Sequence, residues 1–420
     1  MIMKNKIIIL FIIFSAFGFY SYAQVGSSYS RLGVGDIDYS YSADGLAIGG
    51  LGVSLSDPQF ISISNPAGWN RLNLTRIVAS LSYGGMYLSN NSSKSFYGKA
   101  QFEGFTFAFP VSRANGIAVA MGIVPYTSIN YNVEDKNVGF SSTSDTYNIL
   151  YQGLGGLSKV FIGTSYTLPF NLSIGGTFEY YFGNISYSAA TLPNNTGSDA
   201  STSYNKTYNP KGVGTTFGLI SPDLSKVFNS KTISDLRLGL SFNLISALST
   251  DTLLTSTSNI RTDTLGIGTV DMKVPMRISA GLSFAVDKKY YLTFDAASQA
   301  WSNYTFNNIK SNELRNSLKL SAGFEYRPRF DMGMTNWQLV VWRAGISYEQ
   351  TQYQVNGIGI NQLSVAGGFS YPLSPTNTLD IAVQYAIRGT LESNLIQEHT
   401  ISLNAGLSLG SLWFLRSAEE

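Results

Sequence analysis

The chain contains no cysteine and little charge, and each shortage excludes a class of protein. Without cysteine it has no disulfides, no lipoprotein anchor on a cysteine and no cysteine-ligated metal site. Only 13% of its 420 residues are charged, whereas soluble proteins carry roughly 25%. We therefore expect a solvent other than water over much of the surface.

Long apolar runs are also missing after the N-terminus, although 44% of the residues are hydrophobic. No later segment supplies the ~20 consecutive apolar residues that a membrane-spanning helix needs. A closed β-barrel is the other architecture that satisfies every backbone polar group in lipid. The 26 Tyr and 25 Phe favour a barrel, because aromatic residues are frequent in strands and in the girdles of membrane barrels.

Residues 1–23 have the features of a secretory signal peptide. Lys4 and Lys6 form a positive end, and the apolar stretch 7–19 is too short for a stable span. Ser21-Tyr22-Ala23 offers small residues for cleavage. A membrane-anchoring helix is the alternative interpretation. Without this leader, basic and acidic residues are equal in number, so nothing favours nucleic-acid binding.

From Ile77 onward, apolar and polar residues alternate with a period of two, as in β-strands whose two faces meet different surroundings. A charge on the lipid face near the midplane costs about 2–4 kcal/mol for Arg or Lys, whereas a charge in the lumen does not. A soluble β-sandwich would also alternate, but its outward face would carry more charge. The charges that fall on the polar phase are Arg237, Arg277, Lys319, Glu325, Arg343 and Asp380.

The segments predict an all-β fold, a transmembrane antiparallel β-barrel of about 14 strands over residues 77–414. The expected strand centres are residues 82, 107, 121, 162, 179, 216, 241, 280, 295, 322, 344, 366, 383 and 406. Long polar gaps at 89–101, 132–145, 188–211, 250–270 and 390–397 are expected to be outer loops, and the short gaps periplasmic turns. An even strand count places both barrel ends, with a tail at 415–420, in the periplasm.

Residues 24–76 precede the first clear strand and are rich in Gly, Ser and Asp. A barrel of this size is wider than the eight-stranded barrels that side chains alone can fill. The segment is therefore a candidate plug inside the lumen. A disordered periplasmic leader is the alternative.

Several stretches resemble the FadL-type family of outer-membrane transporters for hydrophobic compounds. Near the N-terminus they are Ala47-Ile48-Gly49-Gly50-Leu51-Gly52 and Asn65-Pro66-Ala67. Val274-Pro275 with Trp301-Ser302, and the segment 342–348, are similar to further family signatures. The end of the chain, from Gly406 to Trp413-Phe414, looks like a signal for the barrel-assembly machinery.

The resemblance implies a barrel in the outer membrane lipid of a Gram-negative cell, with Asn65, Pro66 and Ala67 in a hatch that plugs the lumen. It implies passive uptake of hydrophobic small molecules such as long-chain fatty acids, with an interrupted third strand as a side opening. Pro125 lies in the third expected strand and cannot donate a ladder hydrogen bond, so we interpret it as a lateral gate. The alternative is that Pro125 begins a loop.

Diverged members of that family suggest a second function, as a non-transporting subunit or cargo carrier of an outer-membrane secretion or assembly complex. For transport, Arg277 and Arg343 could bind an anionic head group such as a carboxylate. Alternatively, they pair with Glu325, Glu349 or Asp380 and brace the wall.

Catalysis has little support in the sequence. The single histidine, His399, has Ser402 three residues away, which in a strand lies on the opposite face. No catalytic residues, metal site or cofactor are expected.

Overall fold

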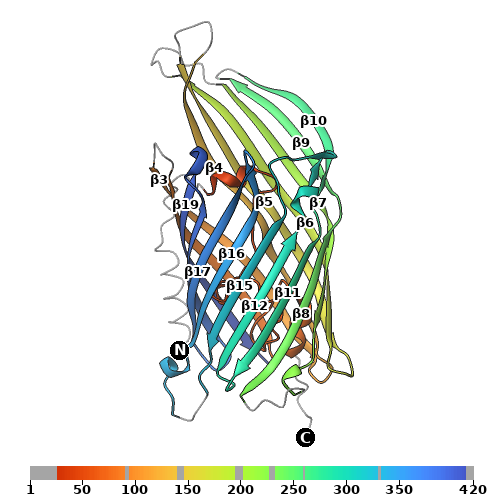
Figure 1. Cartoon of the computed structure of the whole chain (residues 1–420). Coiled ribbons are helices and arrows are strands. Elements are labelled where there is room, and N and C mark those ends of the chain that lie inside the picture. The colour runs from red at the N-terminus through yellow and green to blue at the C-terminus, as the bar shows by residue number, and fades with distance from the viewer. Residues whose placement is uncertain are drawn as a thin grey trace, which may run out of the picture.

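The computed structural model describes residues 26–89, 94–139, 146–193, 202–226, 232–258, 261–329 and 333–412. Within them one antiparallel sheet closes on itself, because β19 (Gln397–Ser411) pairs with β2 (Thr75–Ser89). The result is a closed barrel of 14 spans, which confirms the expected fold class and strand number (Figure 1). The proposed signal peptide and the tail 415–420 lie outside the described residues.

The spans follow one another in chain order around the barrel. Two of them are interrupted: β8 (Ile233–Ile245) continues as β9 (Leu248–Ser258), and β10 (Thr262–Lys273) as β11 (Arg277–Val286). A small hairpin, β13 (Thr305–Phe306) and β14 (Ile309–Lys310), follows β12. The remaining spans are β3 (Lys94–Ser112), β4 (Ile117–Gly139), β5 (Thr146–Thr167), β6 (Ser173–Pro193), β7 (Thr202–Ile220), β12 (Tyr290–Gln299), β15 (Ser317–Tyr326), β16 (Val341–Val355), β17 (Ile358–Pro372) and β18 (Thr378–Gly389).

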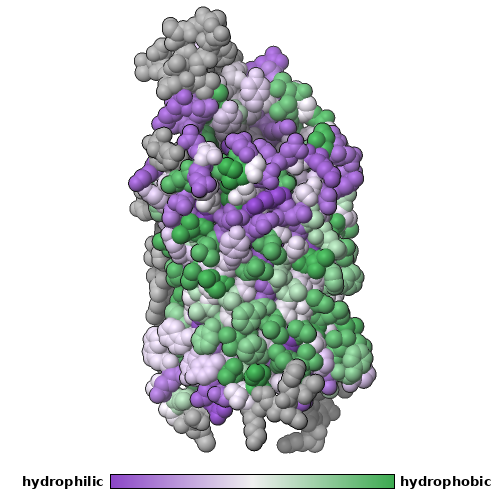
Figure 2. Space-filling view, in the orientation of Figure 1, coloured by the Kyte–Doolittle hydropathy of each residue, from purple (hydrophilic) through white to green (hydrophobic). Residues whose placement is uncertain are grey.

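The two phases of each strand face the surroundings that the alternation predicts. Arg237, Lys319 and Asp380 are buried inside the barrel. The neighbouring residues Leu238 and Leu320 point outward and are 50% and 45% exposed. Figure 2 shows the resulting apolar belt around the lower part of the barrel, below a hydrophilic upper region.

The strands from β4 to β7 are 19 to 23 residues long, whereas a tilted strand needs about 9–11 residues to cross a membrane. With β9 and β10 they form a tall extension on one side of the barrel (Figure 1). We expected outer loops at 89–101, 132–145, 188–211 and 250–270. This expectation is wrong, because most of the described residues in these ranges are in strands. Both faces of this extension meet water, so the alternation that reveals a strand in lipid is absent from its sequence.

Residues 26–74 run inside the barrel, where Figure 1 shows them in red and orange. They form four short elements: η1 (Ser28–Arg31), β1 (Asp36–Ile37), α2 (Ala43–Ala47) and η2 (Pro66–Arg71). We call this segment the plug. The barrel begins at Thr75, two residues earlier than the expected boundary. None of the helices in the described residues is long and apolar enough to cross a membrane.

The plug backbone contacts glycines at wall positions that face into the barrel, and we call these glycines the glycine seat. A Cβ at Gly239 would lie 2.5 Å from the Val53 carbonyl oxygen, and one at Gly345 would lie 2.5 Å from the Gly49 nitrogen. Real Cβ atoms do not approach backbone so closely, so only glycine allows the plug backbone to rest on the wall. Four more inward glycines make similar close approaches to the plug: Gly175, Gly218, Gly281 and Gly323.

An apolar cluster joins the upper part of the plug, around η1, to the wall at the upper rim (Figure 1). Tyr29 of η1 stacks on Tyr353 at 6.3 Å between ring centroids, and its hydroxyl donates to the Ile396 carbonyl at 2.6 Å. We call this cluster the roof. Its other buried members include Leu32, Val34, Leu248, Met272, Trp301, Tyr304, Leu314 and Leu395.

We expect Gly345→Ala to destabilise the protein by about 1–3 kcal/mol, because the added methyl group overpacks the contact with the plug. The measurement is thermal unfolding in detergent, together with ion conductance in planar bilayers, which should rise as the plug loosens. Gly367→Ala is the matched control, since its Cβ would meet its nearest heavy atom at 3.8 Å. Equal behaviour of the two variants would contradict a glycine seat for the plug.

Candidate functional site

The wall of the barrel is interrupted in its upper half between β3 and β4. Their ladder ends at the pair Phe105–Ile123, and no β3–β4 pair is found beyond it in the described residues. Above this point β3 pairs with β2, and β4 pairs with β5. Pro125 lies just beyond the last pair, where the β4–β5 ladder shifts register. The two strands therefore separate at the proline that we interpret as a lateral gate.

The plug occupies the edge of β4 that β3 leaves. β1 pairs with Thr127 and Ser128. Nearby, the Asp38 N–H donates to the Tyr126 carbonyl at 3.0 Å. Because an unpaired backbone group costs free energy away from water, these bonds stabilise both the free edge and the position of the plug.

A cavity of about 240 Å³ lies behind this break in the wall. The plug lines it with residues 36–40, and the β3 edge lines it with Tyr97, Lys99, Gln101 and Glu103. Its charged side chains are Asp36, Asp38, Glu103 and Glu349 against Lys99, Lys319 and Arg388. These charges favour a polar group, because ionised side chains are costly to strip of water, and apolar side chains such as Ile37, Leu46 and Met86 share the lining.

Most of these charges are already paired. Arg388 Nη1 lies 2.6 Å from Asp36 Oδ1. Lys319 Nζ lies 3.9 Å from Glu349 Oε2 and 4.3 Å from the ring centroid of Tyr39. The pairs connect the plug to β15, β16 and β18, so the cavity is part of the framework that holds the plug.

Asp38 is the exception, because its buried Oδ2 has no hydrogen-bond partner in the described part of the chain. The pKa of the Asp38 carboxyl is raised to about 6, because burial raises it more than nearby Lys99 lowers it, and Asp36 contributes to the rise. Its ionised form is therefore poorly stabilised at neutral pH.

Arg277, one of the two predicted ligand-binding residues, lies between an aromatic ring of the plug and one of the wall strand β4. Its guanidinium carbon is 5.6 Å from the ring centroid of Tyr39 and 5.5 Å from that of Tyr126. Its buried Nη1 has no hydrogen-bond partner within the described ranges. The stacking holds the cation by its planar face.

Arg343, the other predicted residue, lies at a second cavity of about 350 Å³ toward the lower end of the barrel. Its Nε is 2.6 Å from Glu325 Oε2. This ion pair agrees with the alternative interpretation, in which Arg343 pairs with Glu325 and braces the wall. The two arginines do not line one pocket, so a shared head-group site remains a prediction.

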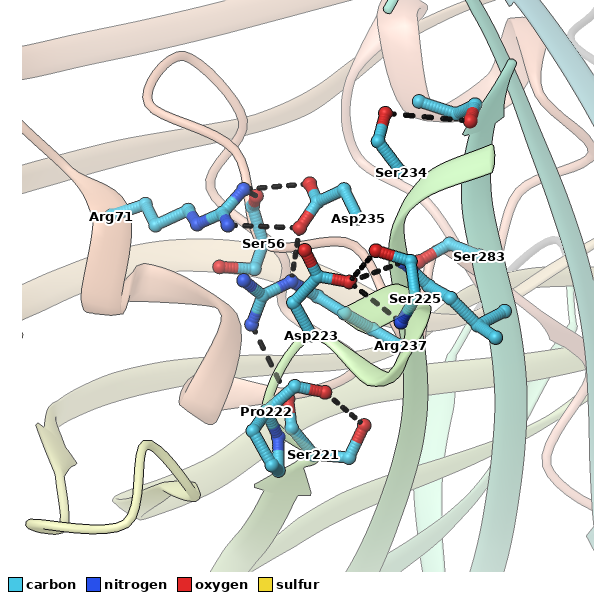
Figure 3. A network of polar contacts seen from close by, with 12 residues as sticks. Ser56, Arg71, Ser221, Pro222, Asp223, Ser225, Ser234, Asp235, Arg237 and Ser283 are labelled. Carbon is cyan, nitrogen blue, oxygen red and sulfur yellow. Dashed lines mark hydrogen bonds and ion pairs between the residues drawn. The ribbon is translucent and has the colours of Figure 1, made fainter. Parts of the chain in front are cut away.

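Ion pairs also anchor the plug at its lower end (Figure 3). Arg71 of η2 donates from two nitrogens to Asp235 of β8, at 2.7 and 2.8 Å. Asp235 also accepts from Arg237 at 2.6 Å. On the other side Arg327 pairs with Asp57, and this pairing holds the pKa of the Asp57 carboxyl below its usual value although burial opposes it.

The predicted hatch residues Asn65, Pro66 and Ala67 are buried at the start of η2. The Asn65 side-chain N–H group donates to the Val53 carbonyl at 2.7 Å and to Leu219 of β7 at 3.1 Å. The side-chain oxygen Oδ1 of Asn65 accepts a hydrogen bond from the Ala67 N–H at 3.0 Å. A single asparagine thus caps the helix and joins the plug to the wall.

Sequence reasoning missed the glycine seat, the roof and Asp38. The seat had a readable signal, since its glycines fall on the polar phase of their strands. The roof had none, because it joins residues of the plug, of several strands and of their connections that lie far apart in sequence.

Comparison with known proteins identifies the family. The sequence model of BamG matches residues 1–418. The chain belongs to the BamG family. A search of curated proteins finds no match to this BamG-family sequence.

Solved structures similar to this BamG-family chain share its fold at low identity. The toluene transporter TodX of Pseudomonas putida matches with a TM-score of 0.58 and 13% identity, over 90% of this chain and 100% of its own. The toluene transporter TbuX of Ralstonia pickettii gives 0.56 and 14%, over 89% and 99%. A FadL homologue of Pseudomonas aeruginosa gives 0.55 and 11%, over 89% and 98%. These structures therefore confirm the fold that the FadL-type resemblance implied, whereas the sequence family is BamG.

No group of three or more His, Cys, Asp or Glu side chains that could hold a metal ion is found among the described residues. His399 lies in β19, where its Nδ1 is 2.7 Å from the Tyr385 hydroxyl oxygen.

We expect Asp38→Asn to stabilise the protein above pH 6 and to have little effect below about pH 4. The folded-state pKa of about 6 exceeds the ordinary value of 3.8, so ionisation of Asp38 opposes folding as the pH rises through this window. The measurement is the melting temperature in detergent at a series of pH values.

Asp263→Asn, on the exposed strand β10, is the control and should change the pH profile little. A constant offset between wild type and Asp38→Asn from pH 4 to pH 8 would contradict the assignment.

Proposed function

We propose that this chain is a non-transporting, FadL-like barrel subunit of an outer-membrane protein-assembly complex. The observation that carries the proposal is the filled lumen. The plug rests on inward glycines, its upper part packs into the apolar roof, and both cavities described above have charged side chains in their linings.

A hydrophobic ligand entering from above would have to separate the roof and then pass charged groups. Both steps cost free energy, since the roof would lose apolar contacts and the charges would lose hydration. Membership of the BamG family supports the proposal, because the name links the family to the barrel-assembly machinery. In a passive channel we would expect an apolar path, which this lining does not provide.

The proposed location is the outer membrane of a Gram-negative cell. The leader at 1–23 would direct export, and the tall extension would lie outside the cell. The short lower turns would then face the periplasm with both ends of the barrel. The role we propose requires no catalytic residue, metal or cofactor.

Passive uptake of hydrophobic small molecules, such as long-chain fatty acids, is the second candidate. The interruption of the wall above Ile123 favours it, because a side opening at Pro125 could release a ligand into the lipid. The plug residues that pair with the β4 edge, together with the charged cavity behind it, weigh against this route.

The decisive experiment purifies the tagged, full-length protein from its own membrane and identifies partners of equal stoichiometry. We expect a barrel-inserting partner, and we expect depletion of the chain to slow the assembly of other outer-membrane barrels.

Uptake of labelled long-chain fatty acid, with and without the gene, separates the two candidates. Unchanged uptake is expected. Loss of uptake in cells that assemble their other barrels normally would overturn the proposal in favour of transport.

A further inference from the structure

β10 stands at one side of the extension above the barrel (Figure 1), and among the described residues only one of its two edges is paired along most of its length. Its ladder with β9 runs along the whole strand. On the other edge, described residues reach only its last three positions: β13 pairs with Met272 and Lys273, and the Asn307 N–H donates to the Asp271 carbonyl at 2.8 Å. Residues 262–270 therefore present a row of backbone groups that no described residue pairs with on this side.

This edge has few of the features by which proteins protect exposed strands. Edge strands are commonly blocked by lysine, proline, inward charge or bulges. Between Asp263 and Asp271 the strand has no charged residue and no proline. One bulge lies at Leu265, and 266–270 continues in regular register with β9.

The side chains along the edge are apolar and open to solvent. Ile267 is 81% exposed and Leu265 is 53% exposed, while Ile309 of the adjacent hairpin is 69% exposed. On the opposite face, a Cβ at Gly266 would have no heavy atom within 4 Å. These isolated apolar groups lie in the upper region, which Figure 2 shows as mainly hydrophilic. They would gain from being covered, because water contact with apolar surface is unfavourable.

The chemistry of the edge specifies what can cover it. A row of free N–H and C=O groups pairs with an extended strand, and side chains on alternate positions provide specificity. The centre of that strand must be uncharged to lie beside Ile267. The charges at its ends impose no sign on the partner, because Asp263 pairs with Arg261 and Asp271 lies two residues from Lys273.

A second copy of this chain fits the edge less well. Two copies paired antiparallel about Ile267 would bring Asp263 of one near Asp271 of the other, and Arg261 near Lys273, at both ends of the ladder. Like charges directly across a ladder are destabilising. Asn307 of each copy would also compete at the Asp271 carbonyl.

We propose that the free edge of β10, residues 262–270, binds an extended segment of a different protein as an added strand outside the membrane. The bound segment has an uncharged centre that lies beside Ile267. The inference rests on the proposed function as a subunit of a complex, and it identifies the surface through which that subunit holds a partner.

The variant that tests the edge is Ile267→Lys with Thr269→Lys in the full-length chain in its own membrane. Lysine on an exposed edge blocks strand addition, so recovery of the stoichiometric partner should fall about ten-fold, as for loss of a central interface residue. Leu253→Lys is the matched control, because Leu253 faces Ile267 across the β9–β10 ladder in a strand with both edges paired. This control should retain the partner.

Hydrogen exchange supplies a readout that does not depend on the variants. The amides of 262–270 that point to the free edge should exchange rapidly in the isolated protein and slowly in the purified complex. A photo-crosslinker at Ile267 should join an extended segment of the partner.

The outcomes separate this inference from the proposed function. Full partner recovery by the double-lysine variant, or unchanged exchange in the complex, overturns the β10 site and leaves the subunit role intact. Absence of any stoichiometric partner on the wild-type chain overturns both. A crosslink between two copies of this chain overturns the assignment of a different protein.

Discussion

The close contact between the plug backbone and the inward glycines of the wall is the constraint on which the rest of the structure depends. With side chains at Gly239, Gly345 and their counterparts, the plug could not approach the wall, and a barrel of 14 spans would enclose an open lumen. Because the seat is made of backbone, it also positions Asn65, Asp57 and Arg71 for their polar contacts with the wall. The filled lumen follows from this packing, and the argument against free passage follows from the filled lumen.

Strand edges explain the two other notable features. A closed barrel leaves no free edge, yet here the ladder between β3 and β4 breaks above Ile123, and β10 is uncovered above the barrel. At the first break the plug supplies hydrogen bonds from β1 to β4, so the chain completes part of its own wall. At residues 262–270 of β10 no described residue does so, which is why we infer a partner there and not at Pro125.

Much of the fold could be predicted from sequence where one face of a strand meets lipid. All 14 expected strand centres fall within described strands, and the charges of Arg237, Lys319 and Asp380 lie inside as expected. The upper halves of β6, β7, β9 and β10 could not be predicted in this way. Water on both faces removes the difference between the phases, so their Ser, Thr and Asn residues resembled loops. The sequence predicted only part of the candidate site. Pro125 lies at the break in the wall, whereas Asp38 and the charges that surround it were not recognised.

The sequence by itself determined which face of each strand meets lipid, the number of spans and the presence of a segment suited to fill the lumen. Those features depend on local periodicity and composition, which a linear pattern records. Only the tertiary structure decided that Arg343 braces the wall, that Arg277 stacks between Tyr39 and Tyr126, and that residues distant in the chain form the roof. The reason is geometric: the contacts of Arg277 and of the roof join residues far apart in the chain, and Arg343 meets Glu325 because the register of two neighbouring strands places them opposite each other.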